Sequence, residues 1–221
     1  MTMRIRITFA KQGALRYTGH LDLQRLWERA ARRAELPLAY SKGFHPQPKM
    51  NLAAALPLGF SSRCELLDMR LEHEIILEGL PERLNNTLPP GIQVTNVEEV
   101  EERAPALQTQ VASAEYEVTL TESAPGSDLK RRIDSVLESE SIIRERRGKR
   151  YDLRPLIEAL TPSPEGRREK ILMRLTAREG ATGRPEEVLD VLGIAFEDVK
   201  VERTQLIFYS PSTNEEIASG R

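Results

Sequence analysis

The chain has 221 residues, of which 39% are hydrophobic and 30% are charged. This composition is typical of a globular protein and excludes a largely disordered chain, and no apolar run approaches the roughly 20 residues of a membrane-spanning helix. The single cysteine, Cys64, excludes an internal disulfide and any metal or iron–sulfur site that needs several thiolates. Because the N-terminal residues lack the apolar core of a signal peptide, we expect a cytoplasmic protein. We also expect no membrane partner, no bound metal and no cofactor.

The net charge of −2 hides an uneven distribution of charge along the chain. Residues 1–49 contain ten Lys and Arg residues against three acids, a balance of +7, so the remaining residues carry −9. Segregation on this scale creates a local field that attracts anions even when the whole protein is mildly acidic. The sequence therefore predicts that the functional surface lies in the first fifty residues.

The first half of the chain predicts alternating strands and helices. Polar and apolar residues alternate from Arg4 to Phe9, which is typical of a half-buried strand. From Leu21 to Ala34 the apolar residues follow one stripe of a helix, and Pro37 ends it. Further elements are predicted as strands at 50–56 and 65–71, a helix at 75–88 and a strand at 92–100. The order β-α-β-β-α-β is that of a ferredoxin-like domain.

The second half repeats this order without repeating the sequence. Its predicted elements are a strand at 116–120, a helix at 128–137, strands at 142–144 and 171–176, a helix at 185–192 and a strand at 199–209. The acidic segment 98–110 is predicted to be a linker. We therefore expect an α+β protein of two tandem ferredoxin-like units, residues 1–104 and 105–209, followed by a polar C-terminal tail, residues 210–221.

Four arginines of the first predicted helix lie on one side of it: Arg25, Arg29, Arg32 and Arg33. A planar guanidinium can donate two hydrogen bonds to one phosphate, so such a row favours phosphate binding. The alternative is that these side chains pair with acids elsewhere in the fold.

The loops on either side of this helix are also basic and contain aromatic residues. Lys11, Arg16, Tyr17 and His20 precede the helix, and Lys42, Phe44, His45 and Lys49 follow it. Cations that hold phosphates, together with rings that stack on bases, are typical of single-stranded RNA surfaces. The alternative for Phe44 is an anchor in the hydrophobic core.

A second basic run follows the first helix of the second half: Arg146, Arg147, Lys149 and Arg150. It predicts an additional nucleic-acid contact, and its alternative is a solvated loop. His20 and His45 raise a separate hypothesis, because two imidazoles can act as general acid and base in metal-independent RNA cleavage. The alternatives are a helix-start residue for His20 and a loop residue for His45.

Four segments carry a resemblance to a known family: Phe9–Gly13, Arg16–Leu23, Arg29–Ala34 and Tyr40–Pro48. Together they resemble the radical-SAM-linked bacterial family of unknown function, whose members occur as separate chains or fused behind a radical-SAM enzyme. The resemblance implies a radical-SAM protein as partner. With one cysteine, this chain cannot itself hold the three-cysteine cluster of such an enzyme.

We therefore expect a non-catalytic RNA-binding or substrate-presenting accessory protein for a radical-SAM enzyme that acts in tRNA or rRNA modification or processing. One alternative is a metal-independent ribonuclease that uses His20 and His45. Another is a protein–protein adaptor whose basic face meets an acidic surface.

Overall fold

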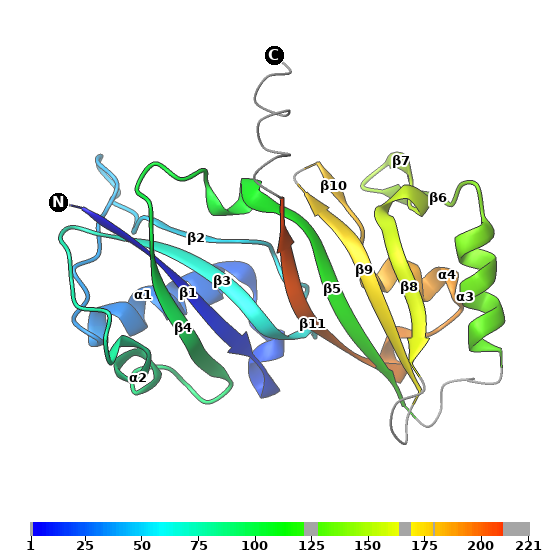
Figure 1. Ribbon diagram of the computed structural model, residues 1–221, viewed down its shortest axis with the longest axis horizontal. Coiled ribbons are helices and arrows are strands. Elements are labelled where there is room, and N and C mark those ends of the chain that lie inside the picture. The colour runs from blue at the N-terminus through cyan, green and yellow to red at the C-terminus, as the bar shows by residue number, and fades with distance from the viewer. Residues whose placement is uncertain (1, 122–127, 164–168, 179, 210–221) are drawn as a thin grey trace, which may run out of the picture. The chain divides into compact units, whose positions relative to one another are not determined.

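The computed structural model describes residues 2–121, 128–163, 169–178 and 180–209, and the chain divides into two compact units, residues 1–110 (unit 1) and 111–221 (unit 2). Both units contain helices and strands, which confirms the predicted α+β class (Figure 1). No helix in these described ranges is long and apolar enough to cross a membrane. The predicted tail, residues 210–221, lies outside the described residues.

Unit 1 has its strands and helices in the order β-α-β-β-α-β. Two 3-10 turns accompany them, η1 (Gly13–Tyr17) and η2 (Leu107–Gln110). The elements are β1 (Met3–Lys11), α1 (His20–Arg33), β2 (Met50–Leu52), β3 (Ser61–Leu71), α2 (Leu80–Asn85) and β4 (Ile92–Val100).

The strands of unit 1 pair in the order β4-β1-β3-β2, and every pair is antiparallel. The alternation read from the sequence places Ile5, Ile7 and Phe9 of β1 on one face, where all three are fully buried. Helix α1 packs on this face through Trp27, whose ring meets the ring of Phe9 edge-on with 4.8 Å between centroids.

The predicted helix 75–88 is wrong in extent, because α2 spans only Leu80–Asn85. Pro81 has no N–H and is tolerated only in the first turn of a helix, so the helix cannot extend far toward the N-terminus. Gly79, with a φ of 72°, starts the helix in a left-handed conformation. Residues 75–79 are therefore irregular.

A charged cluster covers the other face of β1 and β3. The carboxylate of Asp68 accepts hydrogen bonds from Arg4 Nη2 at 2.6 Å and from Arg6 Nε at 2.7 Å. Arg4 also donates to the carbonyl oxygens of Ala104 and Pro105, at 2.6 and 2.8 Å. The segment that the sequence predicts to be a linker is thus bonded to the sheet of unit 1, and this compact unit ends at residue 110.

Unit 2 contains its own antiparallel strands, paired in the order β11-β5-β9-β8, with β10 paired to the end of β9. A separate hairpin joins β6 to β7, and the 3-10 turns η3 (Arg154–Leu156) and η4 (Phe196–Asp198) complete the unit. The elements are β5 (Val111–Leu120), α3 (Leu129–Glu138), β6 (Ile143–Arg146), β7 (Lys149–Asp152), β8 (Ile157–Ser163), β9 (Lys170–Arg178), β10 (Ala181–Thr182), α4 (Pro185–Val191) and β11 (Val199–Phe208).

Strand β8 is absent from the elements predicted from the sequence, which place the second strand of this unit at 142–144 instead. Those residues enter the β6–β7 hairpin, and the strand that pairs with β9 is β8. The register of β8 shifts between Ile157 and Ala159, which breaks the period of two, and Pro162 is a strand breaker. In the described part of the chain β8 pairs only with β9, and an edge strand tolerates proline.

The Asp68 cluster predicts a stability contrast within unit 1. Replacing Asp68 by Asn should lower the free energy of unfolding by about 3–5 kcal/mol, because it leaves buried guanidinium charge without a carboxylate. Glu102→Gln removes the partner of Arg70 at a half-exposed pair and should cost less than about 1 kcal/mol. Urea unfolding of the two variants tests this, and equal losses would show that burial of the Asp68 pair does not matter.

Candidate nucleic-acid interface

The packing of α1 decides which of its side chains face outward. Leu23, Trp27 and Ala31 are buried against the sheet. Because 3.6 residues make a turn, Arg25, Arg29 and Arg33 fall on one outward-facing row, four residues apart. The row is exposed at all three positions.

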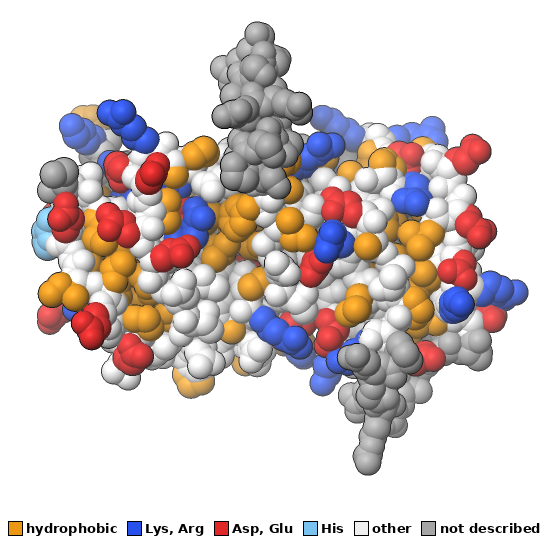
Figure 2. Space-filling view, in the orientation of Figure 1, with side chains coloured by type: hydrophobic (Ala, Val, Ile, Leu, Met, Phe, Trp, Pro, Cys, Tyr) orange, Lys and Arg blue, Asp and Glu red, His pale blue; other side chains and the backbone are white. Residues whose placement is uncertain are grey.

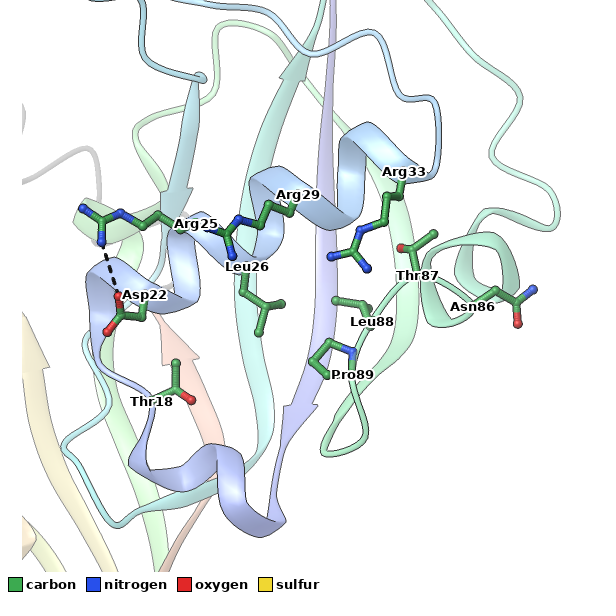
Figure 3. Close-up of a pocket in the computed structure, with 10 residues that line it drawn as sticks. All are labelled: Thr18, Asp22, Arg25, Leu26, Arg29, Arg33, Asn86, Thr87, Leu88 and Pro89. Carbon is green, nitrogen blue, oxygen red and sulfur yellow. Dashed lines mark hydrogen bonds and ion pairs between the residues drawn. The ribbon is translucent and has the colours of Figure 1, made fainter.

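These three arginines line one wall of a hollow of about 530 Å³, which we call the arginine groove. Figure 3 shows the three side chains spaced along α1 above the segment that follows α2. The groove is lined by Thr18, Asp22, Arg25, Leu26, Arg29, Arg33, Asn86, Thr87, Leu88 and Pro89.

The arginine groove has an excess of positive charge. Its one acidic lining residue, Asp22, lies 3.5 Å from Arg25, and both side chains are 69% exposed. Within the described ranges, Arg29 and Arg33 form neither an ion pair nor a hydrogen bond through their side chains. The facing wall is uncharged, so two guanidinium groups remain available to an anion.

Sequence analysis missed that facing wall, residues 86–89. The sequence predicts only a helix at 75–88 here, and Asn86 and Thr87 carry no charge that marks them as part of a binding site. Thr87 Oγ1 donates to the carbonyl oxygen of Ala30 at 3.2 Å and so ties this segment to α1. Only the pairing of distant segments shows that they form a groove.

The structure separates Arg32 from the other three arginines. Its Nε donates to Tyr40 Oη at 3.1 Å, its guanidinium lies 5.7 Å from the centre of the Tyr40 ring, and Glu28 lies 2.8 Å away. The hydrogen bond to Tyr40 is the largest cause that raises the pKa of Arg32. Arg32 therefore joins α1 to the start of the next loop and does not line the arginine groove.

Two hydrogen bonds between Ser41 and Gln47 close the loop that follows Tyr40, and we call this closure its neck. The N–H of Ser41 donates to the carbonyl oxygen of Gln47 at 2.8 Å, and the N–H of Gln47 donates to Ser41 Oγ at 2.9 Å. Tyr40 and Pro48 form an isolated β-bridge just outside this closure. We call residues 41–47 the aromatic loop.

Phe44 lies at the tip of the aromatic loop and is fully exposed, at 102%. The alternative interpretation, that Phe44 anchors the hydrophobic core, is therefore wrong. Lys42, His45 and Lys49 are also exposed. In Figure 2, Lys and Arg side chains lie over the loop that projects at the upper left of the view.

A second, smaller hollow connects the base of this loop to α1. It has a volume of about 370 Å³ and is lined by Leu21, Gln24, Arg25, Glu28, Gln47, Pro48 and Met50. Arg25 lines both this hollow and the arginine groove. The two predicted binding segments of unit 1 therefore meet at Arg25.

The basic residues before α1 have different environments. Lys11 is 1% exposed and donates from Nζ to the carbonyl oxygen of Thr18 at 3.1 Å, so the prediction that it contacts RNA is corrected. Arg16 lies 4.7 Å from the centre of the Tyr17 ring and donates to its hydroxyl, and Tyr17 is 62% exposed. Half-buried Arg16 and exposed Tyr17 thus form a pair at the end of η1.

The two histidines of the ribonuclease hypothesis are both exposed, His20 at the start of α1 and His45 in the aromatic loop. Neither lines the arginine groove or the smaller hollow. Across the described residues, no three His, Cys, Asp or Glu side chains are grouped to hold a metal ion. No hydrogen bond joins the two imidazoles within the described ranges.

The second basic run forms the β6–β7 hairpin, with Arg147 and Gly148 at its turn, both with positive φ. Arg146 is engaged within unit 2: its Nε lies 3.0 Å from Glu187 Oε1, and its guanidinium lies 4.8 Å from the centre of the Tyr151 ring. Arg147, Lys149 and Arg150 are exposed. Three of the four predicted residues of this run are thus free to meet solvent, and Arg146 is structural.

Asp152 holds the base of this hairpin. Its Oδ1 accepts hydrogen bonds from the backbone N–H groups of Ile142 at 2.8 Å and Arg154 at 3.0 Å. The bond from Ile142 is the largest cause that lowers the pKa of Asp152. The ionised form is therefore the one that stabilises the hairpin.

These features define an α+β protein with a basic groove beside α1 and an exposed aromatic loop. A family model matches residues 4–185, more than half of the chain, and the chain belongs to this family, DUF2344, described as an uncharacterized protein conserved in bacteria.

Two solved structures align with the chain at low similarity. An unknown protein from Galdieria sulphuraria aligns with a TM-score of 0.28 and 12% identity, over 94% of this chain and 99% of its own. A proposed dyp-type peroxidase protein from Shewanella oneidensis aligns with a TM-score of 0.23 and 9% identity, over 99% of this chain and 95% of its own. No curated protein matches the chain.

The pKa of Asp152 predicts how stability depends on pH. Since its pKa is lower in the folded than in the unfolded chain, its contribution is complete above the unfolded value of about 4 and is lost as the pH falls through the folded value. Asp152→Asn should therefore be less stable than the wild type at neutral pH, with a difference that shrinks in acid. Asp134→Asn, an exposed change on α3, is the control for general charge effects, and a difference independent of pH would contradict the assignment.

Proposed function

We propose that this protein is a non-catalytic RNA-binding accessory protein, which holds the phosphates of an RNA strand in the arginine groove for a radical-SAM enzyme. The observation that carries the proposal is the row of Arg25, Arg29 and Arg33 along one wall of the groove. Guanidinium groups bind phosphate with two parallel hydrogen bonds, and Arg29 and Arg33 have no competing acid in the described ranges.

The shape of this surface favours a chain of phosphates over a single anion. Four residues advance about 6 Å along a helix, so the row extends about 12 Å, a spacing that successive phosphates of one strand can follow. At Arg25 the row continues into the smaller hollow beside Gln47 and Pro48. An extended positive track of this kind suits a polyanion.

The opposite side of unit 1 is less suited to RNA. On this side Glu98 lies opposite Arg6 in the β1–β4 register and Glu102 pairs with Arg70, both acids are exposed, and Figure 2 shows acidic and apolar side chains mixed over the strands of this unit. Acidic groups repel phosphates, so the field of unit 1 favours binding on the α1 side.

The radical-SAM partner is proposed from the sequence resemblance. The four resembling segments lie at the end of β1, through η1 into α1, along α1 and in the aromatic loop. They are therefore the segments that build or flank the arginine groove. The concentration of the resembling segments in one place supports a surface that members of the family use for one kind of partner.

The finer architecture belongs to the same proposal. Strand order is β4-β1-β3-β2 in unit 1 and β11-β5-β9-β8 in unit 2, so corresponding strands occupy corresponding positions. This agreement supports two ferredoxin-like units, with the β6–β7 hairpin as an insertion in unit 2.

The salt dependence of RNA binding tests the proposed function. Affinity for single-stranded RNA should fall with salt with a log–log slope of about −0.7 for each phosphate contact. Arg29→Gln and Arg33→Gln should each weaken binding and reduce the slope by about 0.7, with stability changed by less than about 0.5 kcal/mol. Filter binding across a salt series measures both quantities.

Arg32→Gln is the matched control, because Arg32 is an exposed arginine of the same helix that is bonded to Tyr40 and Glu28. It should reduce the slope less than Arg33→Gln does. Absence of RNA binding at low salt would overturn the proposal in favour of the adaptor alternative. Crosslinking in cells, followed by sequencing of the bound RNA, would identify the substrate.

A further inference from the structure

Phe44 is presented to solvent by a part of the fold that does not need it. A fully exposed phenylalanine contributes no burial to stability, although burying such a side chain would contribute about 1.5–3 kcal/mol. The hydrogen bonds that close the loop use Ser41 and Gln47 instead. The ring of Phe44 is therefore open to a partner outside the chain.

The closed neck also prepares the ring for binding. Pro46 and Pro48 restrict the backbone on one side of Phe44, and the Tyr40–Pro48 bridge joins the two ends of the loop. A loop that is already ordered loses less conformational entropy when it binds. The aromatic loop is thus a preformed support for one exposed ring.

The surroundings of Phe44 indicate the chemistry of its partner. Lys42 and His45 are exposed in the same loop, Lys49 is exposed at its base, and no acidic residue lies between positions 36 and 64 of the sequence. An apolar protein surface alone would not need these cations. A partner that joins a flat apolar face to negative charge would use both the ring and the cations, and a nucleobase on its phosphate backbone is such a partner.

We infer that Phe44 stacks on an unpaired base of the RNA strand whose phosphates lie in the arginine groove, so that the protein selects single-stranded RNA. This inference rests on the proposed function and adds the structure of the substrate to it. The smaller hollow connects the two sites, because Arg25 and Gln47 both line it. A duplex keeps its bases stacked on one another and offers no free base face to the ring.

Fluorescence anisotropy with a short labelled single strand and with the same strand in a duplex tests the inference on the full-length protein. Phe44→Ala and Phe44→Leu should both bind the single strand about tenfold more weakly, because leucine supplies apolar area without a ring to stack. Phe44→Trp should retain binding, and its fluorescence should be quenched by the single strand. Affinity for the duplex should be the same in all four proteins.

The salt slope separates this inference from the proposed function. The Phe44 variants should keep the wild-type slope, since stacking releases no counterions, whereas Arg33→Gln should not. If Phe44→Ala and Phe44→Leu bind the single strand as the wild type does while the arginine variants fail, stacking is overturned and the groove stands. If the wild type binds no RNA, the proposed function and the stacking inference are both overturned. If the Phe44 variants keep RNA binding but lose a protein partner, the ring is a protein contact and the inference is overturned.

Discussion

The burial of Trp27 against Phe9 fixes the rotation of α1 about its own axis, and the candidate interface depends on that rotation. The indole and the benzyl ring are both fully buried and meet edge-on. An aromatic pair of this kind adds about 0.5–1.5 kcal/mol to the burial of its area. Since the helix cannot turn without exposing the indole, Arg25, Arg29 and Arg33 must face the segment after α2.

Charge is handled differently on the two sides of the unit 1 sheet. On the side away from α1, one buried carboxylate, Asp68, compensates the guanidinium groups of Arg4 and Arg6. Compensation there is needed because isolated charge is costly to bury. On α1 the arginines remain in water, so their charge carries no such penalty and stays available. The basic excess of the first fifty residues is thus divided between buried ion pairs of the sheet and exposed arginines of α1.

The sequence predicts those parts of the fold that a local period encodes. Helix α1 and strands β1 and β4 appear near their predicted bounds, because an amphipathic stripe or an alternation marks each. Strand β8 was missed because a register shift and Pro162 interrupt its pattern. In the candidate site, the arginine row was predictable from spacing, but the facing wall at residues 86–89 and the engagement of Arg32 by Tyr40 depend on tertiary contacts.

The neck of the aromatic loop separates the residues that hold the loop from the residues at its tip. Ser41 and Gln47 close it, and residues 42–46 lie beyond that closure. Substitutions at the tip therefore leave the core of unit 1 untouched, and evolution can change them without a loss of folding.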